Sequence, residues 1–309
     1  MVNKDDLSKI GIGTWGIGGF AERDPKNDDR KQIEALKYTF NNGVNLIEAT
    51  YWYAEGKAVE LIKLALDESS KKRDQIFITS TIYPYRNPTL KEAEKEMEIL
   101  LNTLKTDYID TVQFLLSSLP QWGRDESKQI LKKWLSENIV RYVSVTNFDL
   151  ESLREFKEEF GEKLFSHEVI LNFEIRENQD LGIIDFAKEN DIKNFIFQPL
   201  RRNRTVLRNW PLLMELSEKY SKTQNQIILN WLIWKGCIPL TKSENIEHID
   251  ESIGSIGFVM SQEDYLKIDE FRPKGWKAPK IDWYKTGDGQ PIFMLPNIFD
   301  EEYNKQNSI

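Results

Sequence analysis

Short apolar runs alternate with longer amphipathic segments along the whole chain. The short runs are rich in β-branched residues, which is typical of parallel strands buried on both faces. The longer segments repeat apolar residues every three or four positions, as helices do when one face is buried. The pattern predicts strands at 10–15, 44–49, 76–82, 109–115, 140–145, 168–173, 194–198 and 237–240. It predicts helices at 29–42, 56–70, 90–104, 126–137, 150–159, 180–190, 207–220, 224–235, 244–255 and 262–271.

Eight strand-plus-helix units in one chain of 309 residues indicate an α/β fold, a (β/α)8 TIM barrel. The segment Thr89-Leu-Lys-Glu92 has the sequence of a capping box and marks a helix start. We expect residues 1–271 to form the barrel. Residues 272–309 are rich in Gly, Pro and aromatic residues and are expected to pack on the barrel as an ordered C-terminal extension.

The main alternative fold is a doubly wound open sheet. The segment Gly11-Ile-Gly-Thr-Trp-Gly16 fits the letters of a dinucleotide-binding fingerprint. However, its glycines fall inside the first apolar run. A polar stretch, 21–29, then separates them from the first helix, whereas the fingerprint opens a helix directly. The barrel therefore remains the favoured fold.

Composition excludes several function classes. The 42 basic and 50 acidic residues give a net charge of −8, which argues against nucleic acid or an anionic membrane as partner. One cysteine and two histidines are too few for a disulfide framework or a zinc site. The acidic run 300–302 lacks the ligand spacing of a calcium loop. No signal peptide or membrane span is recognised, so a cytoplasmic location is expected.

In a (β/α)8 barrel the active site lies at the C-terminal ends of the strands. His167 precedes the predicted sixth strand, so we expect it at the opposite face with a structural role. The candidates at the strand ends are Glu48, Tyr53, Thr81, Leu115, Thr146, Asn147, Asn172, Glu174, the segment 197–204, Lys242 and Ser243.

Several of these segments, in order, resemble the aldo-keto reductases, which are (β/α)8 barrels that reduce carbonyls with NADPH. The resemblance covers about residues 7–270. It rests on Gly11-Ile-Gly-Thr-Trp-Gly16, Gly43-Val-Asn-Leu-Ile-Glu-Ala-Thr-Tyr-Trp-Tyr-Ala-Glu-Gly56, Asp107-Tyr-Ile-Asp110, Val143-Ser-Val-Thr-Asn-Phe148, Gln198-Pro-Leu200, Ile227-Ile-Leu-Asn-Trp-Leu232 and Ile238-Pro-Leu-Thr-Lys-Ser243.

The resemblance implies a catalytic tetrad of aspartate, tyrosine, lysine and histidine. The tyrosine donates a proton to the carbonyl oxygen, and the lysine, paired with the aspartate, lowers the pKa of the tyrosine. The tyrosine position holds Tyr53 and the aspartate position holds Glu48. The lysine and histidine positions hold Thr81 and Leu115, so the tetrad is degenerate.

These replacements weaken the expected chemistry. Without a nearby cation, Tyr53 is expected to titrate near the ordinary value of about 10, and Leu115 has no hydrogen-bond donor for a carbonyl. We therefore expect weak or no conventional carbonyl reduction, as in a pseudoenzyme. Glu48 either turns to solvent, or stays buried and protonated as a substitute proton donor. The alternatives are thus an active NAD(P)H-dependent oxidoreductase using Tyr53 with Glu48, or a non-catalytic binding or structural protein.

The resemblance also implies cofactor contacts. Thr146, Asn147 and Asn172 occupy the positions that hold the nicotinamide carboxamide, and Phe197 the position that stacks on the ring. Lys242, Ser243, His248 and Glu251 stand where the adenosine 2′-phosphate is held, and Arg202 and Arg204 lie beside the expected pyrophosphate path.

These positions favour NADP(H), with NAD(H) or another phosphorylated ligand as alternatives. Each residue also has a plain structural interpretation: Ser243 as a helix cap, Lys242 as a solvated side chain, Phe197 as core packing, and the arginines as a solvated loop.

The substrate pocket is expected to be aromatic. Trp15 and Trp52 lie near the predicted strand ends, and Trp276 and Trp283 would join them if the tail folds over the barrel mouth. A small-molecule carbonyl or a phosphorylated compound would fit such a pocket. A two-carboxylate hydrolase built on Glu48 and Glu174 is a further alternative, although strands two and six lie on opposite sides of a barrel.

Overall fold

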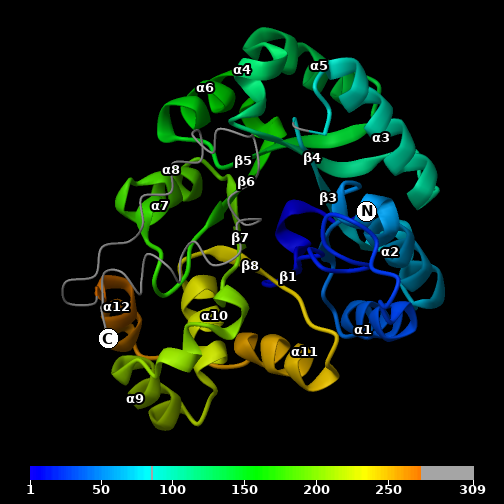
Figure 1. The fold of residues 1–309 in the computed structure, drawn as a ribbon. Helices are drawn as coiled ribbons and strands as arrows, with labels where there is room; N and C mark the ends of the chain where they lie inside the picture. The colour runs from blue at the N-terminus through cyan, green and yellow to red at the C-terminus, as the bar shows by residue number, and fades with distance from the viewer. Residues whose placement is uncertain (85, 273–309) are drawn as a thin grey trace.

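Eight parallel strands close into a barrel and follow one another around it in chain order (Figure 1). The computed structural model describes residues 1–84 and 86–272. The predicted barrel is confirmed, and the doubly wound open sheet is wrong. The strands are β1 (Gly11–Ile12), β2 (Leu46–Glu48), β3 (Phe77–Ile82), β4 (Ile109–Leu115), β5 (Val140–Thr146), β6 (Leu164–Ile170), β7 (Lys193–Phe197) and β8 (Cys237–Thr241).

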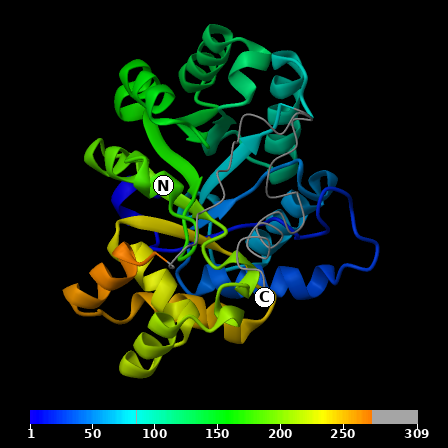
Figure 2. The same ribbon diagram turned by 60° about the vertical axis from the view of Figure 1, so that its left-hand side comes forward.

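Helices surround the barrel, as the two views of Figures 1 and 2 show. Among residues 1–84 and 86–272, no helix has the length and apolar character needed to cross a membrane. The helices are α1 (Asp29–Asn41), α2 (Lys57–Glu68), α3 (Leu90–Leu104), α4 (Ser118–Trp122), α5 (Arg124–Ser136), α6 (Leu150–Phe160), α7 (Glu177–Asp180), α8 (Ile183–Glu189), α9 (Pro211–Tyr220), α10 (Gln224–Trp234), α11 (Ile246–Ile253) and α12 (Gln262–Glu270).

Local helix signals agree with the structure at some positions and fail at others. The capping box is confirmed: the Glu92 amide donates to the Thr89 hydroxyl at 3.3 Å, and the Thr89 amide donates to the Glu92 carboxylate at 2.9 Å. Ser243 does not cap α11. Its hydroxyl accepts from the Asn245 amide, and Asn245 is the residue that caps the helix.

The sixth strand begins four residues earlier than predicted. It starts at Leu164, and Ser166, His167 and Glu168 all lie inside it. The prediction required an apolar run, but β6 buries polar side chains that find partners in the barrel: the Ser166 hydroxyl lies 2.6 Å from that of Ser144. Register with β5 pairs Thr146 with Glu168, which places Glu168 near the C-terminal end of the strands.

His167 is structural, but its predicted place before the strand is wrong. It is buried within β6, and its Nε2 accepts a hydrogen bond from the Phe148 amide at 2.9 Å. Burial lowers the pKa of His167 to about 3. The imidazole is therefore neutral at physiological pH and serves as an acceptor for the turn that follows β5.

The N-terminal end of the barrel is closed by an apolar layer. Phe77 and Phe165 stack with their ring centroids 4.7 Å apart, and Phe195 and Leu46 complete the layer. Above it, hydroxyl pairs such as Thr79 and Thr111, 2.8 Å apart, begin a polar interior. The interior of the barrel is thus apolar at the N-terminal ends of the strands and polar toward their C-terminal ends.

The predicted C-terminal domain, 272–309, lies beyond the described residues except for Arg272. Trp276, Trp283 and the acidic run 300–302 fall in the same segment. Their packing on the barrel remains a prediction.

Candidate functional site

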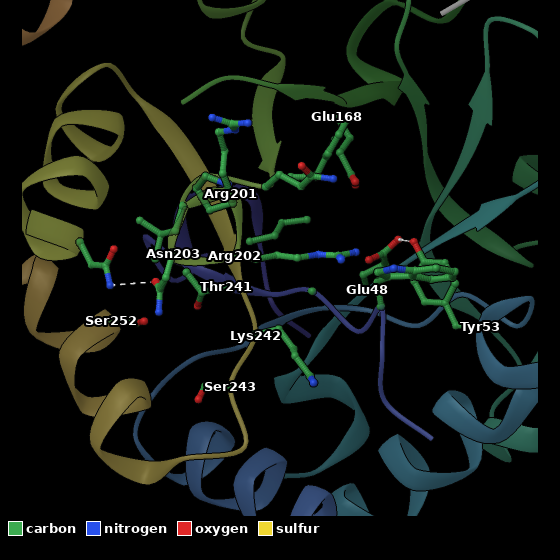
Figure 3. A pocket seen from close by; sticks show the side chains of 18 of the residues that line it. Glu48, Tyr53, Glu168, Arg201, Arg202, Asn203, Thr241, Lys242, Ser243 and Ser252 are labelled. Carbon is green, nitrogen blue, oxygen red and sulfur yellow. Dashed lines mark hydrogen bonds between the residues drawn. The ribbon is translucent and has the colours of Figure 1, made fainter. Parts of the chain in front are cut away.

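A cavity of about 440 Å³ opens at the C-terminal ends of the strands. This is the end at which a (β/α)8 barrel places its active site. Many of the residues singled out from the sequence line it (Figure 3). They are Trp15, Glu48, Tyr53, Leu115, Thr146, Asn147, Phe197, Arg202, Lys242, Ser243, His248 and Glu251.

Tyr53 is positioned by a tight turn after β2. The chain leaves Glu48, and the Tyr53 amide donates to the carbonyl of Thr50 at 3.2 Å. Ala54 and Glu55 then adopt left-handed backbone angles, with φ of 49° and 51°, before α2 begins. This turn directs the Tyr53 ring into the barrel mouth, where it is buried.

Glu48 stays buried, so of the two alternatives the turn to solvent is wrong. The side chain is only 5% exposed, and its Oε1 accepts a hydrogen bond of 2.7 Å from the Tyr53 hydroxyl. The Thr50 hydroxyl also donates to it, at 3.3 Å. Burial raises the pKa of the Glu48 carboxyl, and the hydrogen bond from Tyr53 opposes that rise only in part.

The pKa of Tyr53 lies well above its ordinary value, contrary to the sequence expectation. Burial is the main cause, followed by the nearby charge of Glu48 and the hydroxyl of Tyr83. The two tyrosine hydroxyls are 3.3 Å apart. The Tyr53 hydroxyl is a weak proton donor to a substrate for two reasons. Its pKa is raised, and it already donates a hydrogen bond to the Glu48 carboxyl.

Thr81 does not face the cavity. It begins a hydrogen-bond relay across the barrel instead: its hydroxyl donates to Gln113 Oε1 at 2.6 Å, and Gln113 Nε2 donates to Glu168 Oε2 at 2.8 Å. Glu168 lines the cavity and is 6% exposed. The relay therefore orients a second carboxyl toward the space beside Tyr53 and Glu48.

Sequence reasoning missed Gln113, Glu168 and Tyr83. The first two carried a usable signal, because a long polar or charged side chain inside a buried parallel strand needs a partner or a function. Burial raises the pKa of Glu168 well above its ordinary range, and the charge of Glu48 adds to the rise. Among residues 1–84 and 86–272, no basic group lies within 4.0 Å of either carboxyl.

In the part of the chain that the structure describes, the residues at the end of β5 include an unpaired hydrogen-bond acceptor, Asn147 Oδ1. The Thr146 hydroxyl and the Asn147 amide both donate to the Glu168 carbonyl, at 2.9 and 3.0 Å. Asn147 Oδ1 is buried and, within the described part of the chain, has no hydrogen-bond partner. Asn147 lines the cavity, and its unpaired acceptor together with Thr146 could hold the carboxamide of a nicotinamide cofactor.

Asn172 does not share this role. Its Oδ1 accepts from the amides of Glu174 and Ile175 at 3.0 and 2.9 Å, and its Nδ2 donates to the Gln198 carbonyl at 3.3 Å. These bonds hold the turn after β6, and the residue is absent from the cavity wall. The Asn172 side chain therefore stabilises the loop and does not contact the cavity.

The rim at β8 carries the predicted phosphate contacts. Lys242, Ser243, His248 and Glu251 all line the cavity, together with Ser252. Lys242 is an ion-pair partner of Glu244, with 2.8 Å between Nζ and Oε1. An incoming phosphate would compete with Glu244 for this ammonium.

The arginines of the loop after β7 make different contacts. Figure 3 shows Arg201 and Arg202 pointing in different directions. Arg201 forms a buried ion pair with Glu174, whereas Arg202 extends into the cavity, with its guanidinium 5.8 Å from the centre of the Phe20 ring. Arg204 does not line the cavity. Only Arg202 of the two predicted arginines is therefore placed to meet a cofactor.

Glu174 is the anchor of this loop and not a catalytic carboxylate. It is fully buried, away from the cavity wall. Its oxygens accept bonds of 2.9 Å from Arg208 Nη1 and from Trp210 Nε1, in addition to the pair with Arg201. The hydrolase alternative based on Glu48 and Glu174 is thus unsupported by their placement.

The aromatic wall is partly as predicted. The rings of Trp15 and Trp52 stack with 5.1 Å between centroids, and Trp15 meets the edge of Tyr53 at 5.0 Å. Trp52 supports Trp15 from behind and does not itself line the cavity. Trp276 and Trp283 lie outside the described residues.

Comparison with known proteins places the chain in a family. The model of the aldo/keto reductase family matches residues 9–273. The chain is 27% identical to the glyoxal reductase of Bacillus subtilis over 87% of its own length and 92% of that protein. It is 28% identical to the aldo-keto reductase YhdN of Bacillus subtilis over 64% of its length, and this match spans 60% of YhdN.

Solved structures agree. A thermostable aldo-keto reductase in complex with the inhibitor epalrestat superposes with a TM-score of 0.78 at 27% identity, covering 85% of this chain and 94% of that one. An aldo/keto reductase from Klebsiella pneumoniae, in complex with NADP and acetate, has a TM-score of 0.73 at 21% identity, covering 85% and 90%; it supports the fold alone. With the barrel, the strand-end cavity and the family match in agreement, the chain belongs to the aldo-keto reductase family.

Proposed function

We propose that this protein binds NADP(H) in the strand-end cavity but performs conventional carbonyl reduction weakly or not at all. The observation that carries the second part is the hydrogen bond from the Tyr53 hydroxyl to the buried Glu48 carboxyl. Cofactor binding is supported by the unpaired buried acceptor of Asn147, by Lys242 at the rim, and by a structural neighbour solved with NADP.

Weak carbonyl reduction is expected because the site lacks a good donor for the proton that the carbonyl oxygen must receive. A bound NADPH supplies a hydride, and a protein acid must supply the proton for the carbonyl oxygen. The family's lysine position holds Thr81 here, so Tyr53 lacks the neighbouring cation; burial raises its pKa, and its hydroxyl donates a hydrogen bond to Glu48. Loss of a positioned general acid costs roughly 10²–10⁴ in rate.

We expect NADPH to quench the tryptophan fluorescence of the full chain with a dissociation constant in the micromolar range, a binding free energy of about −8 kcal/mol. NADH is titrated in parallel, because the grip of Lys242 on a 2′-phosphate predicts weaker binding of NADH. Lys242→Met should weaken NADPH roughly tenfold and leave NADH unchanged. The matched control is Lys132→Met on α5, which should change neither affinity.

Absence of binding by either cofactor at millimolar concentration would remove the oxidoreductase interpretation. The protein would then be a non-catalytic member of its family, and other phosphorylated ligands would be the next to test. Equal loss of NADPH and NADH affinity in Lys242→Met would contradict the assignment of Lys242 to the 2′-phosphate.

A second candidate is an active oxidoreductase in which Glu48 provides the proton. It is favoured by the burial of Glu48, which raises the pKa of its carboxyl, and by its position in hydrogen-bond contact with Tyr53 at the cavity wall. In this case Glu48→Gln should reduce NADPH-dependent turnover of an aldehyde by roughly a hundredfold or more while NADPH affinity is kept. Undiminished turnover would rule out Glu48 as the donor.

A further inference from the structure

Two carboxyl groups that line the cavity have no ion-pair partner in the described part of the chain. Glu48 and Glu168 come from β2 and β6, both line the cavity, and both are more than nine-tenths buried. Within residues 1–84 and 86–272, neither has a basic group at ion-pair distance. Burial without a positive partner raises the pKa of both carboxyls, and a ligand with a positively charged nitrogen would favour their ionised forms.

Glu168 is held in place for such a ligand. The bonds from Thr81 to Gln113 and from Gln113 to Glu168 fix which end of the Gln113 amide faces the carboxyl. Gln113 therefore donates to Glu168 Oε2. The second oxygen of Glu168, Oε1, has no hydrogen-bond partner in the described part of the chain, and the residue lines the cavity.

Aromatic rings form the adjacent wall. Trp15, Phe20, Tyr53 and Tyr83 line the same cavity, and the Trp15 and Phe20 rings are 5.5 Å apart. Aromatic faces attract organic cations, most strongly where water is excluded. Carboxyls on the floor and rings on the wall are the two kinds of group that recognise a positively charged nitrogen.

The basic side chains that line the cavity form no ion pair with Glu48 or Glu168 in the described part of the chain. Lys242 is paired with Glu244 at the rim. Arg202 extends into the cavity, and Figure 3 shows its side chain directed toward Glu48, but within the described residues its guanidinium forms no ion pair with Glu48 or Glu168. The chain as a whole carries a net charge of −8, which favours the approach of a cation.

We infer that the cavity binds a positively charged nitrogen group beside Glu48 and Glu168, under the rings of Trp15 and Tyr53. Two sources carry this chemistry. One is an ammonium group on the substrate. The other is the nicotinamide ring of the oxidised cofactor, and this second source rests on the proposed function. An ammonium offers a positive charge and up to three hydrogen-bond donors, whereas a neutral or anionic compound of the same shape offers no positive charge.

The first test uses the full chain and three probes of one shape: benzylammonium, benzyl alcohol and benzoate. Titration calorimetry near neutral pH should give roughly tenfold or greater preference for benzylammonium over benzyl alcohol, and no binding of benzoate. The second test compares NADP⁺ with NADPH. If the nicotinamide ring is the cation, NADP⁺ should bind roughly tenfold more tightly than NADPH.

Glu168→Gln is the deciding variant, and Glu48→Gln is the second in case the first fails to fold. Either should abolish the preference for the charged form. The matched control is Glu96→Gln, because Glu96 is also a buried carboxyl with a pKa raised to about 7, but it lies on α3 outside the cavity. It should leave both preferences unchanged.

The outcomes separate the two proposals. NADPH binding without any preference for a charged nitrogen, or a preference that survives in Glu168→Gln and Glu48→Gln, would overturn this inference and leave the proposed function intact. Preference for benzylammonium without binding of either cofactor would support the cation site and overturn NADP(H) binding. Preference for NADP⁺ alone would identify the cofactor ring as the cation.

Discussion

Replacing Thr81 with lysine and Leu115 with histidine in the same chain should raise kcat/KM for a small aldehyde with NADPH by roughly 10²–10⁴, or about 3–5 kcal/mol of transition-state stabilisation. The backbone amide of Thr81 donates to the Thr50 hydroxyl, which in turn donates to Glu48, so position 81 lies close to this carboxyl. A lysine there would bring a cation to the Glu48 carboxyl and lower the pKa of Tyr53. A histidine at 115 would place a donor in the cavity wall.

The matched control is the pair Thr81→Met and Leu115→Phe, which enlarges both side chains without adding a charge or a donor. It should show no gain. The measurement is steady-state oxidation of NADPH by an aldehyde such as 4-nitrobenzaldehyde, with NADPH affinity determined beside it. If the lysine and histidine variant keeps its NADPH affinity and gains no activity, the assumption that the tetrad changes alone limit the reaction is wrong.

Glu174→Gln should lower the free energy of unfolding by about 3–5 kcal/mol, because it removes the charge that two guanidinium groups share. Glu174 is fully buried and accepts bonds from Arg201, Arg208 and Trp210. The variant keeps the shape of the side chain but leaves the arginines facing an amide. Urea denaturation followed by circular dichroism measures the change.

The control for this prediction is an exposed ion pair. Glu94 on α3 contacts Lys133 at 2.8 Å, with side chains 33% and 51% exposed. Glu94→Gln should therefore change stability by no more than about 1 kcal/mol. A Glu174→Gln variant as stable as Glu94→Gln would show that the loop after β7 is held mainly by its other contacts.

The arrangement of strands and helices could be derived from the sequence because it depends on local patterns. β4 was predicted at its observed bounds, and the start of α3 followed from its capping box. β6 was misplaced because the sequence criterion was apolar character. A barrel interior tolerates Ser166 and Glu168 when residues from neighbouring strands provide hydrogen bonds, and those neighbours are distant in the chain.

The cavity wall was predicted well where a residue ends a correctly placed strand or directly follows it. Glu48, Thr146, Phe197 and Lys242 are of this kind. Tyr83 follows β3 directly but was missed, because the resemblance assigned a role on this strand only to Thr81.

The sequence by itself determined the barrel, the family and the replacement of two tetrad residues by Thr81 and Leu115. Only the tertiary structure decided which charges are buried and what they contact. It placed Glu48 against Tyr53, turned Thr81 to Gln113, brought Glu168 into the cavity and tied Arg201 to Glu174. The physical reason is that strand and helix periodicity is a local property of the chain. Burial, pKa and hydrogen-bond partners, in contrast, are set by residues that the fold brings together from distant positions.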